Sequence, residues 1–180
     1  NETLKHYFGY DSLRPGQQEL IEGILQRKDV LGIMPTGAGK SLCYQVPALM
    51  LDGITIVVSP LISLMTDQVK ALNQAGVHAA YINSSLTENQ IRTALFYAAQ
   101  GRYKIIYVAP ERLNTMRFLE FACQVDISMV TVDEAHCISQ WGQDFRPSYV
   151  GIADFLAQLP KRPVVSAFTA TATERVKQDI

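Results

Sequence analysis

Residues 30–41, VLGIMPTGAGKS, join an apolar run to a glycine-rich turn that ends in Gly-Lys-Ser. An apolar strand, a turn of this kind and a following helix together form a common cradle for nucleotide phosphates. The glycines allow the backbone N–H groups of the turn to point inward. The lysine supplies a compact positive charge for the outer phosphates, and the serine supplies a hydroxyl for Mg²⁺. The predicted phosphate-binding residues are Thr36, Gly37, Ala38, Gly39, Lys40 and Ser41.

Met34 departs from the general phosphate-loop pattern GxxxxGK[ST], which has a glycine six residues before the lysine. The residues that would touch phosphate and metal are all present, so the phosphate site remains the prediction. The alternative is a glycine-rich turn with a purely structural role. The Gly-Lys-Ser ending disfavours that alternative.

The run Asp-Glu-Ala-His at residues 133–136 follows SMVTV at residues 128–132, which predicts a strand. Ligands gather at the carboxyl ends of strands in open α/β sheets. Asp133 is therefore placed to hold Mg²⁺, directly or through water, and Glu134 to orient and deprotonate an attacking water. Two solvated acids in a loop are the alternative, which is disfavoured because an unpaired carboxylate beside a buried strand is costly. The sequence predicts nucleoside triphosphate hydrolysis, with Lys40, Asp133 and Glu134 as catalytic residues and Ser41 and Asp133 as metal ligands.

Composition sets limits on the class of protein. The 180 residues, 48% of them hydrophobic, can bury one substantial core, and the net charge of −1 is unlike that of a free-standing nucleic-acid binder. Any contact with DNA or RNA would therefore come from local loops. Three cysteines without a CxxC pair and three scattered histidines predict no zinc site. We expect a cytoplasmic protein without a membrane segment, and a chain that is a fragment of a longer protein, because it lacks an initial methionine and stops inside an apparent helix.

Strand-like and helix-like segments alternate along the chain. Strands are expected at residues 30–34, 54–59, 79–83, 104–109, 129–133 and 164–168. Helices are expected near residues 17–27, 41–51, 62–75, 87–100, 111–122 and 149–158. This alternation predicts an α/β fold of the RecA-like P-loop NTPase type, with a mostly parallel sheet and helices on both faces. Pro47 is expected to kink or split the helix at 41–51.

With these motifs in this order, the chain resembles the first motor domain of the RecQ-family DNA helicases, within helicase superfamily 2. The resemblance runs from about residue 7 to residue 180. Upstream of the phosphate loop, YFGYDSLRPGQQEL at residues 7–20 resembles the adenine-recognition segment of these helicases. Tyr10 and Arg14 could sandwich the base, and the amide of Gln17 could pair with its edge. A plain helix entry, with Pro15 in the first turn, is the alternative.

Further segments resemble the parts of the family that bind single-stranded DNA. SPLISLMTDQV at residues 59–69 leads from a strand end into a helix and could hold a DNA phosphate, although an ordinary turn is the alternative. Arg112 lies in an equivalent place, after the strand expected at 104–109, and could also contact DNA. A salt bridge within the fold explains this arginine as well. FTATA at residues 168–172 resembles the third helicase motif, whose hydroxyl residues can hydrogen-bond the Asp-Glu-Ala-His run.

The segment CISQWGQDFRPSY at residues 137–149 resembles the aromatic-rich loop that couples DNA binding to hydrolysis in the RecQ family. Its aromatic rings could stack on unpaired bases, and its arginine could bind phosphate. The alternative is that the tryptophan anchors the core. The predicted DNA-binding and coupling residues are Ser59, His136, Gln140, Trp141, Phe145, Arg146 and Thr169.

The resemblance implies ATP and Mg²⁺ as cofactors, and single-stranded DNA and DNA junctions as partners. It also implies that residues 1–180 form the N-terminal ATP-binding domain of a 3′–5′ helicase of the bacterial nucleoid. A second motor domain, absent from these residues, would supply an arginine to the γ-phosphate. This chain alone is therefore expected to bind ATP weakly and hydrolyse it slowly, without unwinding DNA.

Another superfamily 2 motor, acting on RNA or double-stranded DNA, remains an alternative. A small-molecule kinase or passive nucleotide-binding module is disfavoured, because no arginine-rich lid is visible and Glu134 points to water as the nucleophile.

Overall fold

One parallel sheet organises the computed structural model, which describes residues 2–35, 39–142 and 144–180. The six strands lie in the order β1-β6-β5-β2-β4-β3, and every neighbouring pair is parallel. The strands are β1 (Val30–Ile33), β2 (Ile54–Val58), β3 (Ala79–Ile82), β4 (Ile105–Val108), β5 (Ile127–Val132) and β6 (Val164–Thr169). The predicted strands are all present, and the prediction of a mostly parallel sheet is confirmed.

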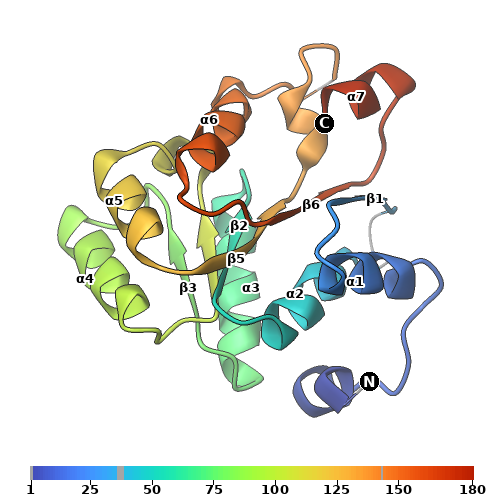
Figure 1. Ribbon diagram of the computed structural model, residues 1–180, viewed down its shortest axis with the longest axis horizontal. Helices are drawn as coiled ribbons and strands as arrows, with labels where there is room; N and C mark the ends of the chain where they lie inside the picture. The colour runs from blue at the N-terminus through green and yellow to red at the C-terminus, as the bar shows by residue number, and fades with distance from the viewer. Residues whose placement is uncertain (1, 36–38, 143) are drawn as a thin grey trace.

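Helices cover both faces of the sheet, as predicted (Figure 1). One face carries α1 (Gln17–Leu25), α2 (Lys40–Met50) and α3 (Ile62–Gln74), and the other carries α4 (Glu88–Ala99), α5 (Met116–Gln124) and α6 (Gly151–Gln158). Every residue of the central strands β2 and β5 is buried. This burial explains why both strands are nearly continuous apolar runs and not alternating ones.

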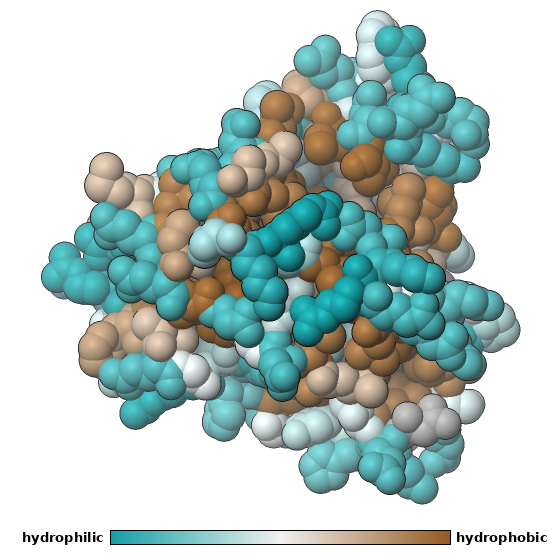
Figure 2. Space-filling model, viewed as in Figure 1, coloured by the Kyte–Doolittle hydropathy of each residue, from teal (hydrophilic) through white to brown (hydrophobic). Residues whose placement is uncertain are grey.

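The face of the molecule that is turned to the viewer in Figure 1 carries both hydrophilic and hydrophobic side chains. Hydrophilic side chains lie over much of this face, with hydrophobic groups between them (Figure 2). Within the described part of the chain, no helix has the length and apolar character that crossing a membrane requires.

Two expected helices differ from the structure. Helix α2 continues through Pro47 and is not split, and its residues from Cys43 to Ala48 are buried. The proline removes one backbone hydrogen bond, but packing of the buried helix holds its course. The helix expected at 111–122 is instead a 3₁₀ turn at Pro110–Arg112 followed by α5. Its start is delayed because Thr115 is extended and its hydroxyl donates to the Arg112 carbonyl at 2.8 Å.

Short helical turns complete the fold. A π-helix at Leu4–Phe8, 3₁₀ turns at Ala135–Ile138 and Pro147–Val150, and the terminal helix α7 (Glu174–Asp179) lie outside the sheet.

The carboxyl ends of four neighbouring strands define one rim of the sheet. Ile33 of β1 pairs with Thr169 of β6, and Val132 of β5 pairs with Val58 of β2 and with Ala167 of β6. The residues that leave these strands therefore lie along one edge, in the order of the strands. The phosphate loop, the third motif, the Asp-Glu-Ala-His run and the segment at 59–69 all begin there.

Candidate active site at the sheet rim

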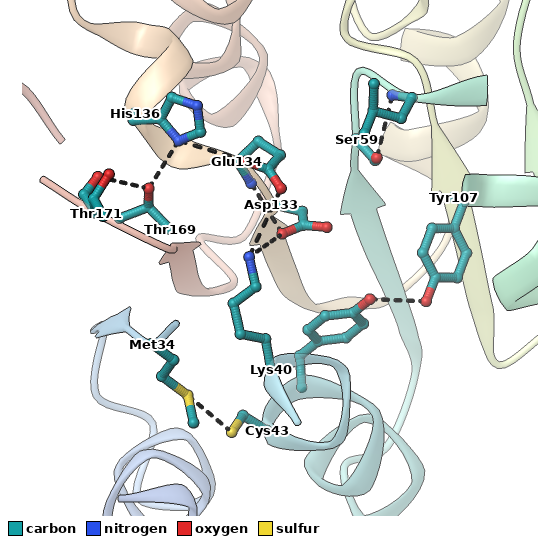
Figure 3. Close-up of polar contacts among 12 residues, drawn as sticks. Met34, Lys40, Cys43, Ser59, Tyr107, Asp133, Glu134, His136, Thr169 and Thr171 are labelled. Atoms are coloured by element: carbon teal, nitrogen blue, oxygen red, sulfur yellow. Dashed lines mark hydrogen bonds and ion pairs between the residues drawn. The ribbon is translucent and has the colours of Figure 1, made fainter. Parts of the chain in front are cut away.

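Lys40 lies beside the two carboxylates that follow β5. It is the first residue of α2, and its Nζ lies 3.9 Å from Asp133 Oδ1 and 3.7 Å from Glu134 Oε1 (Figure 3). The three side chains are only partly accessible, with exposed fractions of 17%, 10% and 26%. Two motifs distant in the sequence thus form one charged cluster.

Asp133 is the buried member of this cluster. Burial raises the pKa of its carboxyl, while the Lys40 charge lowers that pKa and the neighbouring Glu134 raises it. The backbone N–H of Glu134 also donates to Asp133 Oδ1 at 2.9 Å. Cations near this carboxylate therefore stabilise its charged form.

The predicted Mg²⁺ ligands have suitable chemistry. The described residues include no group of three or more His, Cys, Asp or Glu side chains that could hold a metal ion. Mg²⁺, however, usually binds through one or two carboxylates together with substrate phosphates. The buried carboxylate of Asp133 and the half-buried hydroxyl of Ser41 fit that mode.

Glu134 occupies an unusual backbone conformation. Its φ of 51° and ψ of 44° lie in the left-handed region. Among the described non-glycine residues, only Glu134 and Arg27 have a positive φ. Such a conformation costs on the order of 1–3 kcal/mol and is typical of functional sites. Here it begins the 3₁₀ turn at Ala135–Ile138, with the Cys137 N–H donating to the Glu134 carbonyl at 3.0 Å. The sharp turn directs the Glu134 side chain toward Lys40 while the chain leaves toward Trp141.

Tyr149 supports the same turn and was not recognised from the sequence. Its side chain is fully buried, and its hydroxyl donates to the backbone carbonyl of Asp133 at 2.8 Å. Burial raises the pKa of the Tyr149 hydroxyl far above its ordinary value, so the group stays a neutral donor. The contact joins residues on separate elements, and no local pattern indicates it.

His136 connects Glu134 to β6 (Figure 3). Its Nδ1 lies 2.8 Å from the Thr169 hydroxyl, which itself donates to the Thr171 carbonyl at 3.1 Å. Since that hydroxyl has only one hydrogen, it accepts from the Nδ1–H of His136. The same Nδ1 is 3.5 Å from Glu134 Oε2, and Nε2 is 3.7 Å from Asp144 Oδ2. His136 thus touches the glutamate, the third motif and the aromatic loop.

The segment at residues 7–20, which is predicted to recognise adenine, contacts Gly39 through Gln17. The amide of Gln17 is buried: its Oε1 accepts from the Arg14 N–H at 2.7 Å, and its Nε2 donates to the Gly39 carbonyl at 3.1 Å. A Cβ at Gly39 would lie 2.4 Å from Gln17 Nε2, so this approach requires glycine. Tyr10 and Arg14 are exposed, and their contact with a base stays a prediction. The predicted residues Thr36, Gly37 and Ala38 lie outside the described residues.

Met34 shows how the departure from the general loop pattern is accommodated. Its side chain is 8% exposed and turns into the core, where the Cys43 thiol lies 3.7 Å from its sulfur (Figure 3). The thioether therefore packs on helix α2 and not among the groups at the rim.

Ser59 and Arg112 are engaged within the fold. Ser59 is 1% exposed, and its hydroxyl oxygen accepts a hydrogen bond from the Leu61 N–H at 3.5 Å. Arg112 forms an ion pair with Glu88 at 3.4 Å. In this structure Ser59 lies in a strand-to-helix turn, where it is buried, and Arg112 lies in a salt bridge within the fold. Both residues therefore fit the simpler alternatives. Contact of Ser59 with DNA stays a prediction.

The loop after the 3₁₀ turn exposes its aromatic side chain. Trp141 is 64% exposed, so the alternative in which it anchors the core is wrong. Gln140 and Arg146 are also exposed and Phe145 is half-buried, while the Arg146 N–H donates to the Cys137 carbonyl at 2.9 Å. The loop thus leaves Glu134, presents a ring to solvent, and returns to the turn that bears the glutamate.

Residues 14–180 match the model of the DEAD/DEAH box helicases, and the chain belongs to this family. Membership of the family implies the use of ATP. The chain is 52% identical over 178 residues to the ATP-dependent DNA helicase RecQ of Bacillus subtilis, and 47% identical over 178 residues to that of Haemophilus influenzae. The matches cover 98% and 99% of this chain and 30% and 29% of these relatives, so the chain spans about 30% of their length.

Solved structures of other helicases share the fold. The Mycobacterium smegmatis helicase Lhr bound to single-stranded DNA and AMP-PNP matches with a TM-score of 0.75 at 18% identity, covering 97% of this chain and 25% of that one. This likeness confirms the predicted RecA-like architecture.

Proposed function

We propose that this chain is the ATP-hydrolysing motor domain of a RecQ-type DNA helicase. The observation that carries the proposal is the contact of Lys40 with Asp133 and Glu134 on a rim that continues directly into the exposed Trp141 loop. The similarity to RecQ helicases over almost the whole chain supports the choice of DNA helicase.

In the proposed mechanism, Glu134 is the general base. Its carboxylate is partly exposed at the rim, where it can accept a proton from the water that attacks the terminal phosphate. Lys40 binds the outer phosphates and stabilises charge that develops on them. Mg²⁺ when bound neutralises phosphate charge, and Ser41 and Asp133 are the residues that would hold it. Tyr10, Arg14 and Gln17 position the adenine.

Single-stranded DNA would act on this site through the loop. A base stacks on Trp141, with Phe145 and Arg146 beside it, and Gln140 contacts the strand. Movement of the loop reaches Glu134 through His136, which lies 3.5 Å from that carboxylate and bonds Thr169. DNA binding would thus adjust the group that activates water.

In a longer protein, the chain would work with a second motor domain. That domain would supply an arginine to the γ-phosphate, and the pair would track single strands 3′ to 5′. Residues 1–180 alone would then hydrolyse ATP slowly, in the nucleoid compartment where the DNA lies.

The choice of nucleic acid is tested by ATP turnover of the full-length protein with single-stranded DNA, with RNA and with neither. We expect strong stimulation by single-stranded DNA and little by RNA. Equal stimulation by RNA would favour an RNA motor. The expected preference for DNA rests on the similarity to RecQ DNA helicases, because no residue of the proposed site reads a 2′-hydroxyl. Stimulation by neither would remove the proposed coupling.

A further inference from the structure

Arg175 of α7 lies on the face of the Trp141 ring. Its guanidinium carbon is 3.8 Å from the centre of the indole, which is well within the range of a cation–π contact. Both side chains are exposed. The mechanism proposed above gives Arg175 no role, yet the arginine covers one face of the ring on which a base could stack.

A second contact fixes the loop to the same helix. The Ser139 hydroxyl donates to Asp179 Oδ2 at 2.6 Å and accepts from the Trp141 N–H at 3.2 Å. Ser139 is 1% exposed, so this pair of bonds is sheltered from water on one side. The base of the loop is therefore held against α7, and the Arg175 guanidinium is presented to the ring.

Open space adjoins the covered ring. A surface hollow of about 480 Å³ lies between the loop and the start of α7, and His136, Trp141, Asp144 and Thr173 are among its lining residues. In Figure 1, α7 lies beside the segment that follows β5. Because the Arg175 side chain is itself exposed, its guanidinium can leave the ring without unfolding of either element.

A planar guanidinium and a nucleobase compete for the same kind of surface. Both stack flat on an aromatic ring, and one ring face holds one of them at a time. The inference rests on the proposed function of Trp141. We propose that Arg175 is a further residue of the single-strand site, whose guanidinium holds the place of a base on Trp141 and is exchanged for an unpaired base when the strand binds.

The test compares Arg175→Ala with Lys177→Ala in the 180-residue chain. Lys177 lies on the same helix and pairs with Glu174 at 2.7 Å, so its removal takes away the same charge without touching the ring. That control is needed because the loss of any cation weakens attraction to phosphates. Affinity is measured from the anisotropy of a labelled single-stranded oligothymidylate at constant salt. We expect Arg175→Ala to bind about two- to fivefold more tightly than Lys177→Ala, the effect of removing an exposed cation–π competitor.

The same comparison in a Trp141→Ala background isolates the ring. The difference between the two variants should vanish there, because no ring remains to be covered. Equal affinities of the two variants with Trp141 present, or weaker binding by Arg175→Ala, would overturn the exchange. If Trp141→Ala leaves strand binding unchanged, the aromatic site itself fails, and the exchange fails with it. The two failures are thus distinguishable.

Fluorescence without DNA tests the contact directly, since Trp141 is the only tryptophan of the 180 residues. Arg175→Ala should change the indole emission and Lys177→Ala should not, with thermal unfolding unchanged in both. Identical emission from the two variants would mean that the guanidinium does not lie on the ring in solution, which contradicts the proposal.

Discussion

Glu134→Gln is expected to slow ATP turnover of the full-length protein by about 10²–10⁴-fold while leaving ATP binding intact. The amide keeps the size of the carboxylate and can still orient a water, but it cannot accept the proton. The left-handed turn at Glu134 and the Tyr149 bond to the Asp133 carbonyl do not depend on the lost charge, so the site keeps its shape. Steady-state turnover and nucleotide affinity, measured together, separate the lost chemical step from lost binding.

The matched control for this variant is Glu88→Gln. Glu88 is exposed, pairs with Arg112 and has no place in the proposed hydrolytic site. Its replacement should leave turnover unchanged. Turnover by Glu134→Gln within a few-fold of the unaltered protein would show that another group activates the water.

Lys40→Ala is expected to lower turnover by about 10²–10³-fold and also to weaken ATP binding. The ammonium group lies 3.9 Å from Asp133 Oδ1 and 3.7 Å from Glu134 Oε1. Without it, the phosphates lose a positive partner, and the pKa of Asp133, already raised by burial, rises further. Nucleotide affinity and turnover should therefore fall together, unlike in Glu134→Gln.

Lys70→Ala serves as the control for the loss of a lysine. Lys70 is an exposed residue of α3 and has no place in the proposed site. If Lys40→Ala binds and hydrolyses ATP like Lys70→Ala, the phosphate site lies elsewhere.

Much of this site could be predicted because parallel strands end at a common rim. Apolar runs such as Ile54–Val58 identify strands buried on both faces, and residues that follow such strands must lie near one another. That reasoning places Lys40 near Asp133 and Glu134 without coordinates.

What could not be predicted depends on tertiary packing. Pro47 interrupts a local hydrogen bond, yet the buried surroundings of α2 keep the helix continuous. The amide of Gln17 satisfies the Gly39 carbonyl, and the hydroxyl of Ser59 turns inward to Leu61. The contact of Arg175 with Trp141 joins two elements that share no local pattern. The local sequence shows which chemical groups a segment carries. It does not show which residues from distant segments lie beside them.

The central claim is that hydrolysis and strand binding share one rim, joined by the loop that leaves Glu134. It is tested most directly by the ratio of ATP turnover with and without single-stranded DNA, compared between the unaltered full-length protein and Trp141→Ala. We predict a large ratio for the unaltered protein and a ratio close to unity for Trp141→Ala, with ATP affinity retained. An unchanged ratio in Trp141→Ala would contradict the account.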